Sequence, residues 1–260
     1  MNINPRKTAV HVLIQITDLH IFTNPDDEFD GVNTANSLKE VLRSVEEEFP
    51  EFDLMIVTGD LVQDREQKAY ENMLKLMGSV TTAPVYYLPG NHDDPELMEF
   101  LLRDQFKPQI DELDNWVIFC LNSYKAGTHG GFLKQRELAW LKDALSHSKD
   151  RHALICLHHH PVSIGSPWMD SMMLENPEDF FNVVDQFSHI KGIVWGHIHQ
   201  EFTATRNGVQ MLGSPSTCAQ FLPAAKQFAM DVKRPGYRWL ELHADGHLET
   251  GIRRIVQDVT

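Results

Sequence analysis

Five short polar motifs, each directly after a short apolar run, constrain the fold of this chain more than any other feature. Apolar runs of about four to eight residues, bounded by turn residues, are typical of buried strands. The motifs therefore place carboxylate, amide and imidazole side chains at the ends of several strands, where one cluster can form. In chain order the motifs are Asp18-Leu19-His20, Gly59-Asp60, Gly90-Asn91-His92-Asp93, His158-His159-His160-Pro161 and Gly196-His197-Ile198-His199.

Each motif has an ordinary explanation when it is taken alone. Asp-x-His, Gly-Asp and Asn-His-Asp all suit turns, because Gly, Asn and Asp tolerate turn backbone angles. Three consecutive histidines also suit a solvated tract. Turn chemistry does not explain why all five motifs occur in one chain, each at a predicted strand end. We therefore interpret them as one functional site.

The first 200 residues alternate between strand and helix patterns. Strands are predicted at Val10–Thr17, Leu54–Thr58, Val85–Leu88, Trp116–Leu121, Ala153–Leu157 and Ile190–Trp195. Helices are predicted over residues 33–49, 65–78, about 95–106, 134–147 and 178–187, with Asn33 as a candidate N-cap of the first.

The pattern changes after Gly196. Asn207-Gly208 and Asp245-Gly246 each separate two strand-like runs, which is a signal for β-hairpins. We predict one domain over residues 1–260, with an α/β part over about 8–200 and an antiparallel β-rich part over about 201–256. The predicted architecture is α/β, with two stacked mixed sheets flanked by helices.

Composition narrows the possible partners and the compartment. The chain has 260 residues and a net charge of −14, so it lacks the basic footprint of a non-specific nucleic-acid binder. It has no apolar run long enough to span a membrane. Three cysteines, Cys120, Cys156 and Cys218, do not make a disulfide framework. We expect a cytoplasmic protein that binds neither nucleic acid nor membrane; the sequence does not indicate an oligomeric state.

The motif residues suit divalent metal ions. Asp18 and His20 are two residues apart at a strand end, so both side chains can face the same way, and His197 and His199 repeat this spacing. Mixed carboxylate, imidazole and amide ligands suit Mn²⁺, Fe²⁺ or Zn²⁺, whereas structural zinc sites usually show closely spaced thiolates. Asp60 can bridge two ions through its two oxygens, and two such ions can hold a hydroxide between them and clamp a phosphoryl group.

The order of the motifs resembles that of the calcineurin-like metallophosphoesterases. Within that superfamily, the chain is most similar to the bacterial class III 3′,5′-cyclic AMP phosphodiesterases, from about residue 12 to residue 250. Two segments carry this finer resemblance: Pro215-Ser216-Thr217-Cys218-Ala219-Gln220-Phe221 and Leu240-Glu241-Leu242-His243-Ala244-Asp245-Gly246. The resemblance implies a metal-dependent enzyme that hydrolyses cyclic AMP to 5′-AMP by direct attack of a metal-bridging hydroxide.

The resemblance also implies a role for each motif residue. Asp18, His20 and His199 would bind one ion, Asn91, His197 and a histidine of the 158–160 run would bind the second, and Asp60 would bridge them. His158 is our choice from that run, and His159 is the alternative. The substrate would contact His20, Asp60, Asn91, His92, His158 and His199.

His92 is the residue we assign to proton chemistry. It follows Asn91 directly, and the resemblance places it beside the phosphate as the proton donor to the leaving alkoxide. The alternative is a turn histidine bonded to backbone. In related phosphatases an aspartate three residues after the Gly-Asp pair orients this histidine. Here the nearest candidate is Asp64, four residues on, which leaves its role open.

Three functions are compatible with the sequence. The leading one is cyclic AMP hydrolysis. The second is a broader phosphodiesterase acting on glycerophosphodiesters or 2′,3′-cyclic nucleotides, and the third is a non-catalytic module, against which the complete ligand set argues. Two further features remain open. His129 could edge the site, and the loop Ser163–Asn176, with Trp168, Met169 and Met172, could cover a nucleotide base or pack against a helix.

Overall fold

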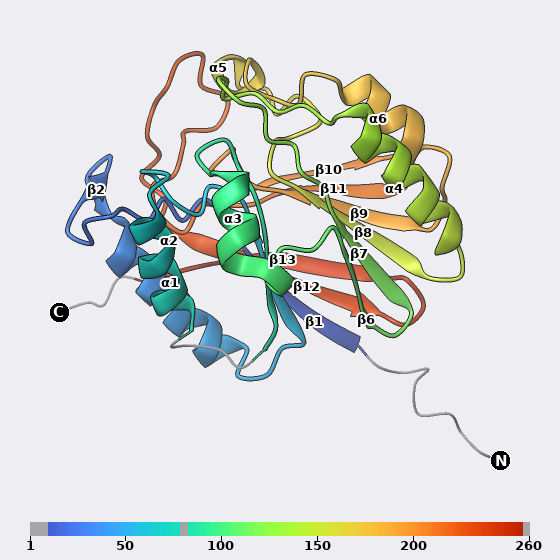
Figure 1. The fold of residues 1–260 in the computed structure, drawn as a ribbon, viewed down its shortest axis with the longest axis horizontal. Coiled ribbons are helices and arrows are strands. Elements are labelled where there is room, and N and C mark those ends of the chain that lie inside the picture. The colour runs from blue at the N-terminus through green and yellow to red at the C-terminus, as the bar shows by residue number, and fades with distance from the viewer. Residues whose placement is uncertain (1–9, 79–82, 257–260) are drawn as a thin grey trace.

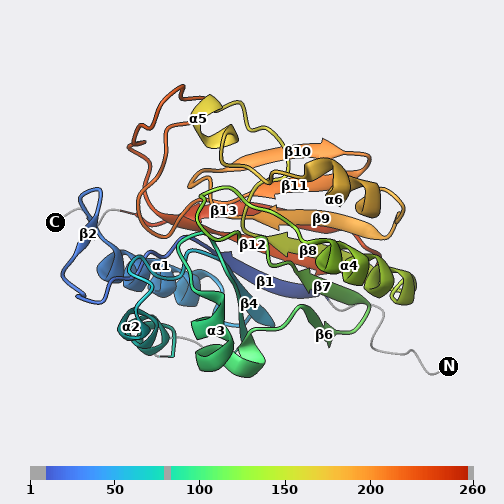
Figure 2. The same cartoon turned by 45° about the horizontal axis from the view of Figure 1, so that its top comes forward.

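The computed structural model describes residues 10–78 and 83–256 of the chain. Two mixed sheets are stacked on each other, and helices lie on their outer faces (Figures 1 and 2). This arrangement confirms the predicted α/β class with two stacked mixed sheets flanked by helices. The predicted start of the α/β part, at about residue 8, lies outside the described residues.

The first sheet combines parallel strands from the start of the chain with a hairpin from its end. β1 pairs in parallel with β4 and antiparallel with β12, and β4 pairs in parallel with β5. The spatial order is β13 (Leu248–Arg254), β12 (Gly236–His243), β1 (Val10–Ile16), β4 (Leu54–Thr58) and β5 (Val85–Leu88).

The second sheet has a parallel centre with an antiparallel strand at each edge. β11, β9, β8 and β7 are parallel, whereas β10 and β6 are antiparallel to their neighbours. The spatial order is β10 (Phe202–Arg206), β11 (Val209–Gly213), β9 (Ile190–Trp195), β8 (His152–Leu157), β7 (Trp116–Cys120) and β6 (Gln109–Leu113).

The helices form two groups, one on each outer face. Side chains of α1, α2 and α3 share a core with the first sheet, and those of α4 and α6 share a core with the second. Figures 1 and 2 show the two groups at different sides of the stacked sheets. The helices are α1 (Thr34–Glu48), α2 (Gln67–Met77), α3 (Pro95–Leu102), α4 (Gln135–His147), α5 (Pro167–Asp170) and α6 (Pro177–Val184).

Most predicted elements are confirmed, with boundaries that shift by a few residues. Asn33 is the N-cap of α1, since its side chain accepts a hydrogen bond from the Asn36 backbone N–H. The helix predicted to residue 106 ends earlier, because α3 passes into a 3₁₀ turn at Arg103–Gln105. Both C-terminal hairpins form, but they join different sheets. The unpredicted elements are β2 (Glu28–Phe29), β3 (Val32–Asn33), β6 and α5.

A third apolar cluster lies between the sheets. It includes Leu13, Ile56 and Leu240 from the first sheet and Leu154 and Val194 from the second, each essentially inaccessible to solvent. Alternate side chains of a strand point to opposite faces, so the same strands also supply the two outer cores. β4, for example, is buried on both faces, and its sequence Leu54–Thr58 is almost continuously apolar.

A buried polar network joins the two sheets directly behind the motif loops. The Gln15 side-chain amide on β1 donates to Thr58 Oγ1 and to the Trp195 carbonyl, at 2.7 and 3.3 Å. Its amide oxygen accepts a hydrogen bond from Ser214, which also accepts one from the Arg238 guanidinium at 3.0 Å. Since Thr58 and Trp195 directly precede two motifs, this network fixes the positions from which those loops begin.

Arg238 is the charged member of this network. Its guanidinium also donates to the Gly213 carbonyl at 2.8 Å and to Thr250 Oγ1 at 3.0 Å, and the residue is only 1% exposed. Burial lowers the pKa of Arg238 to about 10. The side chain therefore connects β12 of one sheet to the end of β11 of the other through neutral oxygen acceptors.

We expect Arg238→Ala to lower the free energy of unfolding by about 2–4 kcal/mol, because it leaves buried oxygens of Ser214 and Gly213 without a donor. Urea denaturation monitored by circular dichroism measures the change. Arg43→Ala, on the exposed side of α1, is the control and should change stability by less than about 0.5 kcal/mol. Equal stability of the two variants would contradict a bridging role for Arg238.

Candidate metal centre

The five motifs converge at one end of the stacked sheets. Backbone pairing between β1 and β4 continues past the strands, where Asp18 N donates to the Gly59 carbonyl and His20 N to the Asp60 carbonyl, both at 3.0 Å. The backbone N–H of His197, after β9 of the other sheet, donates to both carboxylate oxygens of Asp18 at 3.1 and 2.9 Å. This last contact brings together motifs from both sheets.

The backbone at the predicted ligands is strained. Positive φ angles are uncommon outside glycine, and each costs on the order of 1–3 kcal/mol. Such conformations persist only where the surrounding structure enforces them, and they occur often at functional sites. Five of the seven predicted ligands have one: Asp18 at 54°, His20 at 47°, Asp60 at 50°, His197 at 67° and His199 at 48°.

Asp18, His20 and His199 direct electron pairs toward one point. His199 Nδ1 donates to the Ala219 carbonyl, and His20 Nδ1 faces the Gln63 side-chain oxygen, both at 2.8 Å. Because both partners are acceptors, each Nδ1 carries the proton and each Nε2 presents a lone pair. These two Nε2 atoms are 3.2 Å apart, and His199 Nε2 is 3.3 Å from Asp18 Oδ1. The three groups present only acceptor atoms to one another, and such a set fits a cation between them.

Asp60, Asn91 and His158 repeat this arrangement. His158 Nδ1 donates to the Thr58 carbonyl at 2.8 Å, which leaves Nε2 facing Asn91 Oδ1 at 3.2 Å and Asp60 Oδ1 at 3.5 Å. The Asn91 side-chain nitrogen lies 3.2 Å from Nδ1 of His129. This contact sets the amide orientation, so that the Asn91 oxygen points at the other acceptors.

Asp60 lies between the two groups. Its Oδ1 faces His158, whereas its Oδ2 is 3.7 Å from His20 Nε2. Oδ1 also accepts a hydrogen bond from the His92 backbone N–H at 2.8 Å. One carboxylate oxygen is thus directed toward each group, which is the arrangement that a bridging ligand requires.

His197 and the histidine run supply the remaining nitrogens. His197 Nε2 donates to the Met172 carbonyl at 3.1 Å, so its Nδ1 is the nitrogen with a lone pair. Nitrogens of His158, His159 and His197 lie within 4.8 Å of one another. His159 Nε2 is buried without a hydrogen-bond partner, while its Nδ1 contacts Ser123 Oγ at 2.8 Å. Both His158 and His159 therefore lie where they can bind an ion.

Without a cation, a proton on His158 balances the negative charge of Asp60. Burial opposes ionisation of Asp60, but His158 holds the pKa of that carboxyl well below its usual value. In return, although burial lowers the pKa of His158, Asp60 raises it to about 9. A proton on His158 Nε2 occupies the position that a metal ion would take. The buried carboxylate and imidazole donors thus suit a positive species, and they match the ligand preferences of Mn²⁺, Fe²⁺ or Zn²⁺.

Comparison with known proteins decides the family. A family model described as calcineurin-like phosphoesterase matches residues 11–201 of the chain. The chain belongs to the calcineurin-like phosphoesterase family. The resemblance that the five motifs indicated is therefore confirmed.

Curated relatives cover most of this phosphoesterase. The 3′,5′-cyclic adenosine monophosphate phosphodiesterase CpdA of Pseudomonas aeruginosa is 39% identical over 96% of this chain and 92% of its own length. The protein of the same name from Escherichia coli K12 is 39% identical over 94% of this chain and 89% of its own. A 3′,5′-cyclic-nucleotide phosphodiesterase of Nostoc is 38% identical over 94% and 92%.

Solved structures support the fold at low sequence identity. A dimetal phosphatase from Danio rerio matches with a TM-score of 0.67 and 14% identity, over 95% of this chain and 99% of that one. Purple acid phosphatase from yellow lupin matches with a TM-score of 0.64 and 13% identity, over 96% of this chain and 52% of that one. The two-sheet phosphoesterase architecture is thus shared with proteins of distant sequence.

The structure places two aspartates of the phosphoesterase in positions that the sequence did not resolve. Asp64 contacts the Thr23 backbone N–H at 2.6 Å, and no contact with His92 is seen among the described residues. The orienting role considered for Asp64 is therefore not supported. Asp93 was not predicted to act, yet its buried carboxylate accepts hydrogen bonds from the backbone N–H groups of Leu61 and Gly90. Asp93 holds two motif loops together. Its position in the Gly-Asn-His-Asp motif is the sequence feature from which this role could have been predicted.

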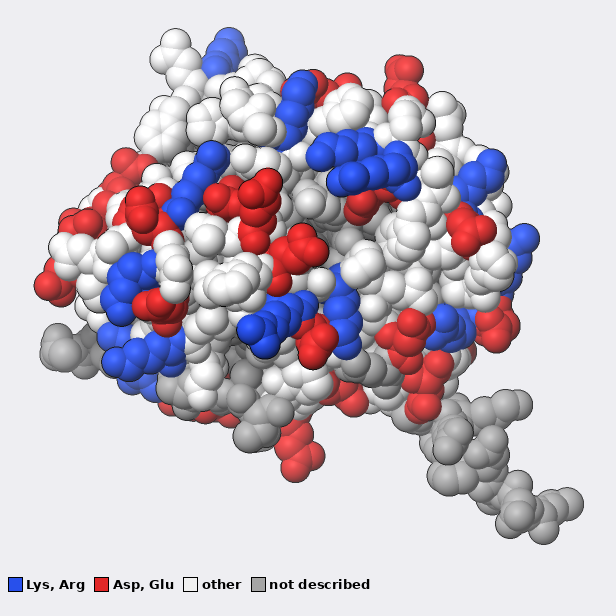
Figure 3. Space-filling model, in the orientation of Figure 1, with Lys and Arg blue, Asp and Glu red and all other residues white. Residues whose placement is uncertain are grey.

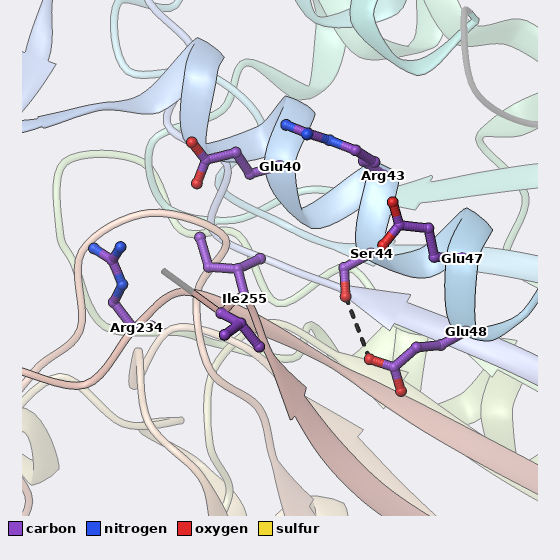
Figure 4. A pocket seen from close by; sticks show the side chains of 8 residues that line it. Glu40, Arg43, Ser44, Glu47, Glu48, Arg234 and Ile255 are labelled. Atoms are coloured by element: carbon purple, nitrogen blue, oxygen red, sulfur yellow. Dashed lines mark hydrogen bonds between the residues drawn. The ribbon is translucent and has the colours of Figure 1, made fainter. Parts of the chain in front are cut away.

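Two hollows differ sharply in their chemistry. One, of about 190 Å³, is lined by candidate ligands together with His92 and His129, which confirms that His129 edges the site. The other, of about 400 Å³, lies between α1 and the end of β13 (Figure 4). Its lining contains none of the motif residues and consists of Glu40, Arg43, Ser44, Glu47, Glu48, Arg234, Ile255 and Val256. The candidate ligands therefore line the first hollow and not the second.

We expect Gly196→Ala to lower the metal content of the protein. A Cβ at this position would lie 1.9 Å from Thr17 Oγ1 and 2.7 Å from Asp18 Oδ2, so the ligand carboxylate must move. Elemental analysis after dialysis against Mn²⁺ measures the number of ions per chain. Gly130→Ala is the control, because its nearest contact would be an ordinary 3.4 Å. Full occupancy in Gly196→Ala would show that the position of Asp18 is not critical for binding.

Proposed function

We propose that this phosphoesterase hydrolyses 3′,5′-cyclic AMP to 5′-AMP. The observation that carries the proposal is the pair of acceptor groups joined by Asp60, because they fit two divalent ions at the centre of the hollow. The names of the relatives, which are 38–39% identical over at least 94% of this chain, support the choice of substrate.

We propose Asp18, His20 and His199 as ligands of one ion, and Asn91, His158 and His197 as ligands of the other, with His159 as the alternative to His158. Asp60 is the proposed bridge. When bound, two divalent ions supply an activated water near neutral pH and positive charge for the phosphoryl oxygens. The buried imidazoles are held by hydrogen bonds from their second nitrogens, which fixes their orientation before any ion binds.

His92 is the proposed proton donor to the 3′-oxygen of the leaving alkoxide. Its backbone N–H is tied to Asp60, and its ring lies between those of His20 and His129, with centroids 5.0 and 5.7 Å away. The pKa of His92 is lowered, mainly because the ring is buried. Asp60 opposes this effect, and His129 adds to it. A bound phosphodiester adds negative charge beside the ring and thereby favours the protonated form that can donate.

The proposed reaction proceeds without a covalent enzyme intermediate. Cys218 is the cysteine nearest the site, but its thiol is buried and donates to the Asp18 carbonyl at 3.4 Å. Burial raises the pKa of Cys218 to about 12, so the thiolate needed for nucleophilic attack is not available at neutral pH. Direct attack by water is therefore the proposed route.

We further propose a small-molecule partner and a cytoplasmic location. No helix among residues 10–78 and 83–256 is long and apolar enough to cross a membrane. Basic and acidic side chains are interspersed on the face drawn in Figure 3. None of the three cysteines forms a disulfide bond, even though Cys120 on β7 lies directly opposite Cys156 on β8. Free thiols at facing positions suit a reducing compartment.

We expect metal-dependent turnover of cyclic AMP. Protein stripped with chelator should be inactive, and added Mn²⁺ or Fe²⁺ should restore activity at two ions per chain. Steady-state kinetics should be measured on 3′,5′-cyclic AMP, 2′,3′-cyclic AMP and a glycerophosphodiester under the same conditions. A higher kcat/KM for either of the last two would favour the broader phosphodiesterase, and activity after exhaustive chelation would refute the metal mechanism.

We expect His92→Ala to retain both ions and to lower kcat on cyclic AMP by about 10²–10⁴-fold, the usual contribution of general acid catalysis. A nitrophenolate leaving group needs little protonation, so kcat on a nitrophenyl diester should fall much less. His199→Ala is the comparison, since loss of a metal ligand should impair both substrates alike. Equal losses on both substrates in His92→Ala, or a loss of bound metal, would exclude the proton-donor role.

A further inference from the structure

The hollow at the metal centre has two walls of different chemistry. One wall consists of the imidazole, carboxylate and amide side chains described above. The other wall is apolar and includes two methionines and four aromatic residues: Phe29, Trp168, Met169, Met172, Phe221 and Phe228. We name Trp168, Phe221 and Phe228 the aromatic wall. A ligand that fills this hollow must therefore have a polar or anionic end and an apolar end.

The three rings of the aromatic wall support one another. Trp168 meets Phe221 and Phe228 edge to face, with centroids 5.2 and 5.5 Å apart, and Phe221 meets Phe228 at 5.4 Å. Such arrangements are favourable pairings for aromatic rings. Phe221 also stacks on the ring of His199, at 4.0 Å and an interplanar angle of 6°. The wall thus adjoins a candidate metal ligand directly.

Phe228 is the exposed member of the wall. It is 51% exposed, whereas Phe221 is 7% exposed. The segment that carries it is held at both ends, because Leu222 N donates to the Ala229 carbonyl at 2.8 Å and Phe221 forms a β-bridge with Met230. An exposed aromatic ring on a fixed segment is available to bind a ligand without reordering of the chain.

A second contact ties this segment to α5. The Ser166 hydroxyl, which precedes α5, donates to the Ala225 carbonyl at 3.0 Å. The Met172 carbonyl, which follows α5, accepts the hydrogen bond from His197 Nε2. The wall and the metal centre are therefore positioned relative to each other by hydrogen bonds.

We propose that the aromatic wall binds the nucleobase of the substrate by stacking, with Phe228 supplying the exposed ring face. The anionic phosphodiester matches the polar wall, and a flat, aromatic base matches the apolar one. This inference rests on the proposed function, because it requires a substrate that carries a base. It makes Phe228 a determinant of base recognition that takes no part in the chemical step.

Isothermal titration calorimetry on the Mn²⁺-loaded protein tests this assignment without turnover. The two ligands are 5′-AMP and ribose 5-phosphate, which differ only in the base. We expect 5′-AMP to bind more tightly to the unaltered protein. Phe228→Ala should weaken 5′-AMP binding by roughly 5- to 140-fold, the usual range for loss of one stacking ring, and leave ribose 5-phosphate binding unchanged.

Two variants act as controls. Phe228→Tyr keeps an aromatic ring and should retain the preference for 5′-AMP. Phe100→Ala removes a ring that is 65% exposed on α3, outside the hollow, and should change neither affinity. Circular dichroism and metal content establish that each variant is folded and loaded.

Several outcomes would overturn the assignment. These are equal affinity of the unaltered protein for the two ligands, no measurable binding of 5′-AMP, or a Phe228→Ala variant that binds both ligands more weakly to the same extent. Failure of the proposed function would appear separately, as absence of cyclic AMP turnover by the metal-loaded protein. A preference for 5′-AMP that depends on Phe228 supports base binding by the aromatic wall, whichever phosphodiester proves to be the preferred substrate.

Discussion

The structure of the site depends on one electrostatic constraint: buried lone pairs of imidazole, carboxylate and amide groups converge on one another. The carbonyls of Ala219 and Thr58 accept hydrogen bonds from Nδ1 of His199 and His158, which turns the other nitrogen of each ring toward carboxylate and amide oxygens. Such an arrangement is unfavourable unless a proton or a cation occupies it. The strained backbone at five of the predicted ligands shows how firmly the two sheets enforce it.

Much of the fold and most of the site could be predicted from the sequence, because doubly buried strands have continuous apolar runs and the motifs follow them directly. β6 was missed because Gln109–Leu113 is an edge strand without such a run. α5 was missed because a helix of one turn has no periodicity to detect. The choice between His158 and His159 could not be made from spacing, since neighbouring residues in a turn point in directions that only the tertiary contacts determine.

Other parts of the site depend on contacts between distant segments. Asp93 is adjacent to the predicted His92, but its action on the Leu61 and Gly90 backbone depends on how two loops fold against each other. Gln63 faces His20 across the site, and no sequence pattern announces that pairing. The exposed Phe228 reaches the hollow only because its segment is bridged back to Phe221. Periodicity and motif spacing report local structure, so they do not predict contacts between segments that are far apart in the sequence.

The position of β12 between β13 and β1 has a consequence for how the molecule is made. β1 begins at Val10, but its antiparallel neighbour begins only at Gly236. At roughly 5–20 residues per second of synthesis, one edge of β1 stays unpaired for about 10–45 s after it leaves the ribosome. The Ala219 carbonyl that orients His199 also emerges late. All the motifs are therefore synthesised before the sheet that holds them is complete, and the candidate metal centre takes its final form only with the last strands.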